Sequence, residues 1–433
     1  MRSTLFYIPH ADPWLHIPMF GIGWLLIVWG LACIGILGWS FRKHGWNEDT
    51  RGYIPLLLVL GAAVVWVGPR LEQMSTAGYP LGIPIRGYGV MLLLGVVCGM
   101  SLAGHEARRV GVDPDVILSA SFWMFAFGIA GARLFYVIEY WNQFASPSWR
   151  ETLMQVFKLT DGGLVVYGSF IGAVCAAVWF FTRHKLPALA IADLLAIGMA
   201  LGVTLGRIGC FLNGCCFGGM CGNSALGVSF PEGSPPYLQQ LERGVLVGMQ
   251  LERDPANNTW VVRHVTPGSL ADKQHLKPGD RVVGIGLPRE KELDRMRHGE
   301  LVPDALVSYV MKDGRRIVWR LGDLPHRTRA IYPTQVFSSI NAALICFFLW
   351  SYFPFRRRDG EVFAGLFTIY PVTRFLLEMI RSDEPSVLPT QFKMTISQTV
   401  SVVIIGLAAA LWIYILTRPR GTSLPVAKGV NRK

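Results

Sequence analysis

Charged residues are scarce in this chain of 433 residues. Asp, Glu, Lys and Arg together make up only 16% of the sequence, whereas 52% of it is hydrophobic and 12% is aromatic. So few charges cannot cover the surface of a soluble protein of this length. The composition therefore excludes an ordinary soluble protein and predicts a membrane protein.

Long apolar runs recur along the chain. A transmembrane helix needs about 17 to 25 predominantly apolar residues, and no small-residue cleavage site follows the first run, which is therefore an anchor and not a cleaved signal peptide. We expect an all-α polytopic membrane protein with about nine transmembrane helices. The predicted spans are 20–40, 53–69, 87–105, 116–139, 163–182, 190–212, 333–353, 361–380 and 396–417.

Lys and Arg are unevenly distributed among the loops. Short cytoplasmic loops collect these residues, and alternate loops are rich in them, as at 356–358 and in the tail after Thr417. With nine spans, this bias predicts that the N-terminus lies outside and the C-terminus in the cytoplasm. The net charge of +12 largely reflects the same bias, with anionic membrane lipids as its natural partner. Nucleic acid is not needed as a partner.

Polar residues are concentrated between Asn213 and Tyr332, on the predicted outer side. This stretch is too long to be a loop without its own fold, and its alternating apolar residues and Pro-Gly pairs predict strands joined by tight turns. Residues 238–325 resemble a PDZ domain, which implies an inserted small α+β domain. The segments that carry the resemblance are "LVGMQL" (246–251), "WVVRHV" (260–265), "TPGSLADKQHLKPGDRVVGIG" (266–286) and "DGRRIVWRL" (313–321).

The PDZ resemblance also implies a peptide-binding loop. Val247, Gly248 and Met249 stand where such domains offer backbone amides to a peptide carboxylate, and the peptide would add to the sheet as a further strand. The alternative is a docking cap without a ligand, because the bulky Met249 lies where the loop must approach the carboxylate. Both interpretations stay open.

Ionisable residues are rare inside the apolar runs, and each is costly there unless it serves a function. Arg207 lies among glycines near the end of the sixth run, and Arg374, Glu378 and Arg381 share one face of a helix. An alternative for Arg381, and for Arg133, is that an arginine near the interface merely reaches lipid headgroups. Several charges on the same side of the membrane favour one polar pocket, where guanidinium groups suit a phosphate.

Six short segments follow one another in a fixed order through the membrane region. They are "IRGYGVML" (85–92), "GARLFYVIEYW" (131–141), "DGGLVVYGSFIG" (161–172), "GRIGCFLNG" (206–214), "YPTQVF" (332–337) and "IYPVTRFLLEMIRSDE" (369–384). In this order they resemble the motifs of the prolipoprotein diacylglyceryl transferase family. The resemblance covers residues 80–417, with the PDZ-like segment where the family has its periplasmic head.

This resemblance implies a multi-pass enzyme of the bacterial plasma (inner) membrane. Such an enzyme moves the diacylglyceryl group of phosphatidylglycerol to the lipobox cysteine of a prolipoprotein, forms a thioether and releases glycerol phosphate. Arg207 corresponds to the family's essential arginine, which is expected to bind the lipid phosphate. The residues implied to bind phosphatidylglycerol are Arg207, Arg374, Tyr88, Asn213 and Gly218.

The histidine that the family usually has in its third core helix is replaced by Tyr167. Tyrosine has a reference pKa of about 10 against about 6.5 for histidine, so Tyr167 suits the deprotonation of a thiol only if a nearby arginine lowers its pKa. The implied catalytic residues are Tyr167, Arg207 and Glu378. Tyr167 or Glu378 would accept the proton while arginines neutralise the departing phosphate, and no metal or other cofactor is needed.

Four of the eight cysteines follow the arginine motif with the spacing C-x4-CC-x4-C, at Cys210, Cys215, Cys216 and Cys221. Structural zinc sites prefer ligand pairs separated by two to four residues on flexible turns, and no His-rich partner segment lies nearby, which argues against a metal. A disulfide is feasible on an oxidising side of the membrane. The remaining interpretation is that these are small packing residues.

Two other functions compete with diacylglyceryl transfer. A membrane protease would also suit a PDZ-like domain, but "HEARR" at 105–109 lacks the second histidine of HExxH, and no GxSG-like nucleophile motif is present. A non-catalytic membrane protein that binds lipid or lipoprotein through the same pocket stays open because of Tyr167.

The predicted organisation places the insert within a split membrane core. The expected partners of the protein are phosphatidylglycerol, the signal peptide and lipobox cysteine of a prolipoprotein, membrane lipids and a peptide ligand of the PDZ-like domain. The predicted parts are two additional N-terminal helices (1–80), the first part of the core (81–237), the PDZ-like periplasmic domain (238–325), the second part of the core (326–417) and a cytoplasmic tail (418–433).

Overall fold

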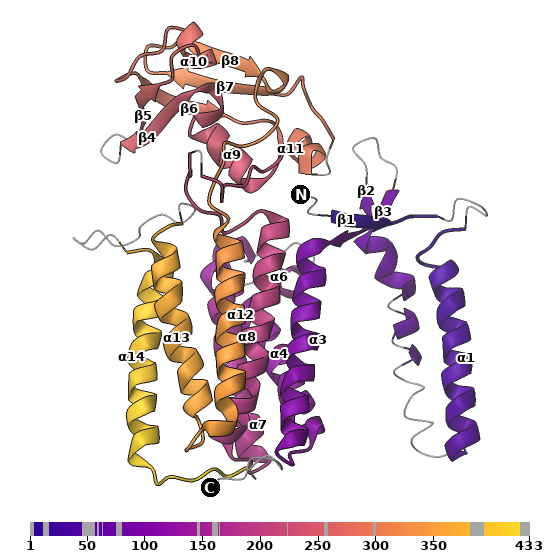
Figure 1. Cartoon of the computed structure of the whole chain (residues 1–433). Coiled ribbons are helices and arrows are strands. Elements are labelled where there is room, and N and C mark those ends of the chain that lie inside the picture. The colour runs from indigo at the N-terminus through magenta and orange to yellow at the C-terminus, as the bar shows by residue number, and fades with distance from the viewer. Residues whose placement is uncertain are drawn as a thin grey trace. The chain divides into compact units, whose positions relative to one another are not determined.

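The structure, a computed structural model, divides into two compact units. One unit comprises residues 1–90 and 209–332, and the other comprises residues 91–208 and 333–433. Figure 1 shows the whole chain. The described residues are 4–11, 17–45, 57–58, 60–62, 64–74, 80–144, 148–157, 163, 165–222, 224–254, 259–297, 300–381 and 394–424.

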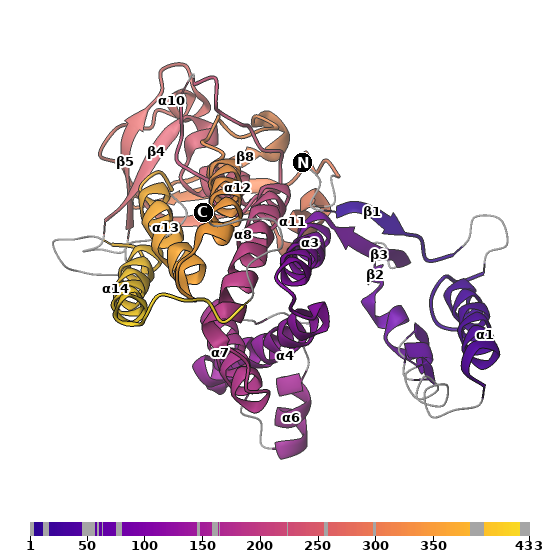
Figure 2. The ribbon, with the colours of Figure 1, turned by 60° about the horizontal axis from the view of Figure 1, so that its bottom comes forward.

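The second unit is a bundle of long helices that stand side by side (Figures 1 and 2). Two of them, α3 and α8, cross the division between the units. The helices are α3 (Gly87–Arg109), α4 (Pro114–Glu139), α5 (Trp141–Phe144), α6 (Trp149–Phe157), α7 (Val166–Arg183), α8 (Ala188–Asn213), α12 (Thr334–Tyr352), α13 (Glu361–Glu378) and α14 (Ile396–Thr417).

Seven helices among the described residues are long and apolar enough to cross a membrane, so the protein is a multi-pass membrane protein. The predicted span at 361–380 corresponds to α13, which is not among the seven and contains Glu361, Arg374 and Glu378. The predicted span at 53–69 lies partly outside the described residues. The count of nine therefore stays a prediction. The seven are Trp24–Arg42, Gly87–Arg109, Pro114–Glu139, Val166–Arg183, Ala188–Asn213, Thr334–Phe355 and Ile396–Thr417.

Glycines allow two pairs of helices to approach closely. A Cβ atom on Gly99 of α3 would lie 2.6 Å from the carbonyl oxygen of Gly198 of α8. Gly131 of α4 and Gly168 of α7 face each other in the same way. Small residues at such crossings let backbones pack against each other inside a membrane, where association depends on close contact. Because Gly168 directly follows Tyr167, the second crossing fixes the position of Tyr167 relative to α4.

A buried aspartate joins α8 to the start of α13. The carboxylate of Asp193 accepts hydrogen bonds from the amides of Gly360 and Phe363, at 2.8 and 2.9 Å. The first amides of a helix have no partner within the helix, and a negative charge is favourable there. Arg356 Nε lies 3.6 Å from the same carboxylate. Asp193 thus caps α13, the helix that carries Arg374 and Glu378.

The first unit begins with a small sheet that the sequence analysis did not predict. Strands β1 (Thr4–Ile8), β3 (Pro80–Arg86) and β2 (Gln73–Met74) form an antiparallel sheet in the order β1-β3-β2. Strand β1 pairs with β3, for example Ile8 with Ile83, so no local pattern reveals this pairing.

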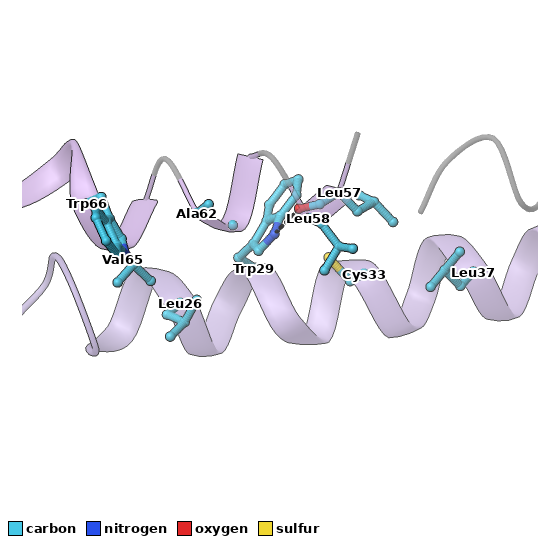
Figure 3. Close-up of a pocket in the computed structure, with 10 residues that line it drawn as sticks. Leu26, Trp29, Cys33, Leu37, Leu57, Leu58, Ala62, Val65 and Trp66 are labelled. Carbon is cyan, nitrogen blue, oxygen red and sulfur yellow. Dashed lines mark hydrogen bonds between the residues drawn. The ribbon is translucent and has the colours of Figure 1, made fainter. Parts of the chain in front are cut away.

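Helix α1 (Trp24–His44) lies beside helical residues between 57 and 66. Figure 3 shows the apolar groove between them, with a volume of about 410 Å³. None of the predicted site residues lines this groove. The lining residues are Leu26, Trp29, Cys33, Leu37, Leu57, Leu58, Gly61, Ala62, Val65 and Trp66.

The polar insert is an α+β domain. Four of its strands overlap the segments predicted from the sequence, whereas β7 (Leu306–Met311) lies in none of them. The five strands form one antiparallel sheet in the order β4-β5-β6-β7-β8, with a buried core that runs from Tyr237 to Leu324. The hydroxyl of Tyr237 donates to the carbonyl of Pro325 at 3.0 Å. The elements are α9 (Pro235–Glu242), β4 (Met249–Asp254), β5 (Thr259–Val265), α10 (Leu270–Lys273), β6 (Arg281–Gly286), α11 (Glu290–Arg297), β7 (Leu306–Met311) and β8 (Arg316–Arg320).

Candidate functional site

Arg207 lies on α8, six residues before the end of that helix, and is partly buried. Its Nη2 atom donates a hydrogen bond to the hydroxyl of Tyr370 on α13, at 3.0 Å. The sequence analysis does not predict Tyr370 as a site residue, although it belongs to the same motif as Arg374 and precedes it by one helical turn. The contact holds the guanidinium of Arg207 beside the face of α13 that carries the other charges.

Glu378 is the centre of a buried ion-pair cluster. Its Oε2 atom lies 2.8 Å from Nη2 of Arg374 and 3.0 Å from Nη1 of Arg381. The side chain of Glu378 is fully buried, and those of Arg374 and Arg381 are only 13% and 4% exposed. The three side chains therefore share one face, as the sequence spacing predicts. Arg381 is paired and buried, so it does not merely reach for headgroups.

The cluster has more positive than negative groups. Among the described residues, Arg207, Arg374 and Arg381 bring three guanidinium groups against the carboxylate of Glu378, and Arg374 is close enough to the other two arginines to be repelled by them. The Nη1 atom of Arg374 is buried and has no hydrogen-bond partner among the described residues. A buried donor without a partner is costly, and an anionic ligand would satisfy it.

Two predicted site tyrosines stand at the starts of helices. Tyr88 is the second residue of α3 and is 40% exposed, and Tyr167 is the second residue of α7 and is 44% exposed. Asp161 and Gly162, at the start of the motif that contains Tyr167, lie outside the described residues. The roles of Tyr88 and Tyr167 stay predictions.

Asn213 and Gly218 follow Arg207 along the chain. Asn213 is the last residue of α8 and is exposed. Gly218 is buried, and its amide donates to the carbonyl of Tyr332 at 2.9 Å, while the amide of Tyr332 donates to the carbonyl of Gly219 at 3.0 Å. Gly218 thus ties together the two chain segments that lead into and out of the inserted domain. Lipid binding by Asn213 and Gly218 stays a prediction.

Arg133 donates its hydrogen bonds to backbone carbonyls of the protein. Its guanidinium donates to the carbonyls of Gln155 and Val156, both at 2.8 Å, and of Gly163 at 3.2 Å. Arg133 is buried and so ties α4 to α6 and to the segment before α7. Arg133 therefore binds within the protein and does not merely reach lipid headgroups.

Three of the four clustered cysteines meet at the C-terminal end of α8. The sulfur atoms of Cys210, Cys215 and Cys216 lie within 4.8 Å of one another. Cys221 is not part of this group. All eight cysteines belong to the described part of the chain, and none of them forms a disulfide there.

The loop predicted to bind a peptide carboxylate uses its amides within the domain. The amides of Val247 and Met249 donate to the carbonyl of Gly244, at 3.2 and 3.0 Å, and the amide of Gly248 donates to the carbonyl of Val245 at 3.2 Å. Gly248 has a φ of +90°, a conformation that favours glycine. A peptide carboxylate at this loop would have to replace these bonds.

Comparison with known proteins gives the family. A sequence model described as prolipoprotein diacylglyceryl transferase matches residues 77–414. A relative from Rhodopirellula baltica, named phosphatidylglycerol–prolipoprotein diacylglyceryl transferase, is 35% identical over 97% of this chain and 90% of its own length. The chain belongs to the prolipoprotein diacylglyceryl transferase family.

Further members of this family match a smaller part of the chain. Relatives of the same name from Synechococcus elongatus and Deinococcus radiodurans are 32% and 34% identical, over 35% and 30% of this chain and 48% and 38% of their own lengths. The resemblance predicted from six ordered motifs is confirmed, and the chain is an enzyme of the transferase class. The alternative of a non-catalytic membrane protein that only binds lipid or lipoprotein finds no support in these matches.

Proposed function

We propose that this chain transfers the diacylglyceryl group of phosphatidylglycerol to the lipobox cysteine of prolipoproteins. The observation that carries the proposal is the buried cluster of Arg207, Arg374, Arg381 and Glu378. Its excess positive charge and the buried Nη1 donor of Arg374 suit the phosphate of a lipid headgroup. The names of the relatives and the family match support the same reaction.

In the proposed reaction, the thiol sulfur of the prolipoprotein attacks C3 of the glycerol that carries the acyl chains. The bond between this carbon and the phosphate oxygen breaks, a thioether forms, and glycerol phosphate leaves with the electron pair. Arg207 and Arg374 stabilise the negative charge of the leaving phosphate. Tyr370 positions Arg207 through the hydrogen bond at 3.0 Å.

In this proposal the thiol proton goes to the phenolate form of Tyr167, which requires that a nearby arginine lowers the pKa of its hydroxyl. Glu378 was the other candidate base, but its Oε2 atom already accepts from Arg374 and Arg381, so we assign it the role of holding the arginines. Tyr88, Asn213 and Gly218 complete the proposed lipid-binding residues.

A transfer assay tests the proposal. Purified protein is mixed with phosphatidylglycerol and a lipobox peptide, and the mass gain on the peptide cysteine is measured. We expect Arg207→Ala to abolish transfer and Arg207→Lys to retain little, because lysine keeps the charge but loses the forked geometry. Arg263→Ala is the matched control, since its ion pair with Glu252 is exposed. Full activity of Arg207→Ala would reject the site.

We also propose that the inserted domain is PDZ-like and faces the periplasm. Its antiparallel sheet and the positions of α10 and α11 support the PDZ resemblance. The outer edge of β4 is partly occupied, because the amides of Met249 and Leu251 donate to the carbonyls of Gly244 and Arg243, at 3.0 and 3.1 Å. A peptide that adds to β4 must therefore displace residues 243–244.

Peptide binding by the full chain decides between the two roles of this domain. If the domain captures peptides, a library of C-terminal peptides should yield binders whose affinity is lost in Gly248→Val, because a side chain at Gly248 would collide with Ser269. If no peptide binds while transfer activity is normal, the domain is a docking cap.

A further inference from the structure

The chain folds back on the end of α8 and brings Cys215 and Cys216 over Cys210. The amide of Cys215 donates to the carbonyl of Cys210 at 3.2 Å. Gly214 and Cys216 have φ values of +76° and +60°. A residue other than glycine rarely adopts a positive φ, and such strain is often found at functional sites. The reversal places three sulfur atoms within 4.8 Å of one another.

This sulfur arrangement suits a thiophilic metal ion. Thiolates are soft ligands that select ions such as Zn²⁺ and Cu⁺. Zn–S bonds of about 2.3 Å place the sulfur atoms of a tetrahedral site roughly 3.8 Å apart, which is compatible with the separation of Cys210, Cys215 and Cys216. A disulfide would join only two of the three sulfur atoms, whereas a metal ion would use all of them.

The exposure of the three cysteines also suits a metal site. All three cysteines are partly buried, so they are shielded without being sealed from small ligands. Three protein ligands leave a fourth position of a tetrahedral ion open, as in sites that bind a ligand from outside the protein. The sequence spacing did not predict this site, because the ligands converge only after the chain reverses at Gly214.

We propose that Cys210, Cys215 and Cys216 bind one thiophilic metal ion as thiolates, with one coordination position open to an external ligand. Binding releases the thiol protons. The proposal concerns this sulfur group alone and does not depend on the assignment of the transfer reaction.

Metal analysis of the full chain tests the proposal. The protein is purified under reducing conditions, exposed to Zn²⁺ or Cu⁺ in separate samples, washed, and its bound metal is measured. We expect about one ion per chain for at least one of the two metals. Ser substitution at Cys210, Cys215 or Cys216 should weaken binding at least about 100-fold, since even partners outside the ligand set contribute about 10- to 100-fold. Cys221→Ser is the matched control and should bind as the wild type does.

A second measurement guards against variants that fail to fold. Bound metal should protect three thiols of the wild-type chain from alkylation, and mass spectrometry of the peptides should identify them as Cys210, Cys215 and Cys216. Absence of both metals from the reduced wild-type chain would overturn the proposal. Equal loss of metal in Cys221→Ser would also overturn it, as would a disulfide between two of the three cysteines in protein taken directly from membranes.

Discussion

At the scale of single residues, the site depends on how one carboxylate arranges several arginines. Glu378 is fully buried and binds two guanidinium groups through the same oxygen atom. An isolated charge at this depth would be costly, and the pairing reduces that cost while leaving the cluster positive. The remaining positive charge is what a lipid phosphate can neutralise.

Glu378→Gln should therefore destabilise the protein and impair transfer together. Removing one partner of a buried ion pair typically costs about 3 to 5 kcal/mol, and here Arg374 and Arg381 would both lose their carboxylate. Thermal unfolding in detergent measures the stability, and the peptide mass assay measures the transfer. Glu252→Gln should change stability by less than about 0.5 kcal/mol, because its pair with Arg263 is exposed. Wild-type stability of Glu378→Gln would show that Glu378 does not hold the arginines.

Tyr167→Phe tests the proposed base. If the phenolate of Tyr167 accepts the thiol proton, the rate of transfer should fall about 10²- to 10⁴-fold, with lipid binding nearly unchanged. If the hydroxyl only positions the phosphate, the loss should appear in lipid affinity, by about 1.5 to 3 kcal/mol.

Tyr167→His separates these two roles through pH. A base acts in its deprotonated form, so activity falls as the pH drops below the pKa of the base. With histidine, activity should persist down to about pH 6.5, which is lower than tyrosine allows. Rate profiles of both variants that match the wild type from about pH 6 to 9 would show that Tyr167 is only a packing residue.

At the scale of elements, close glycine crossings set the helix positions on which the site depends. Gly99 and Gly198 bring α3 against α8, the helix of Arg207, and Gly131 and Gly168 bring α4 against α7. Asp193 fixes the start of α13 from α8. The α3–α8 crossing and the contacts of Asp193 therefore position the helices of Arg207 and of the charged cluster, and the α4–α7 crossing positions the helix of Tyr167.

Gly99→Ala should loosen the α3–α8 crossing. The added Cβ atom would lie 2.6 Å from a backbone carbonyl oxygen that cannot move without shifting a helix. We expect a lower unfolding temperature and weaker transfer, with a destabilisation of about 1 to 3 kcal/mol, as for other overpacked sites. Gly406→Ala is the matched control, because a Cβ atom there meets no atom within 4 Å. Equal unfolding temperatures for the two variants would contradict this account.

Helical periodicity explains why part of the site could be predicted from the sequence. Arg374, Glu378 and Arg381 share a face because of their spacing alone. The contact between Arg207 and Tyr370 joins residues 163 positions apart and depends on how α8 packs against α13, so no local pattern reveals it. The same applies to the convergence of the cysteine sulfur atoms, which requires the chain reversal after α8.

At the scale of the whole molecule, α13 decides the number of membrane crossings. The 18 residues of α13 include three charged ones, whereas α3 and α4 carry three over 23 and 26 residues and each keep a longer apolar stretch. Each of these charges has a partner, however. Arg374 pairs with Glu378, and the carboxylate of Glu361 accepts from the hydroxyl of Tyr352 and the amide of Arg357, at 2.8 and 2.9 Å. Paired charges are tolerated inside a bundle, so we expect α13 to span.

A topology experiment tests how many of the last three helices cross the membrane. If α12, α13 and α14 all span, three crossings separate the inserted domain from the C-terminal tail, and the two must lie on opposite sides. A protease site placed at the β7–β8 turn, at Asp313 and Gly314, should be cut in intact spheroplasts, whereas the same site after Lys433 should be cut only after permeabilisation. Cleavage of both sites in intact spheroplasts would mean that only two of these helices cross. The arginines of α13 would then have to lie at the surface of the membrane, and not in a buried lipid-binding pocket.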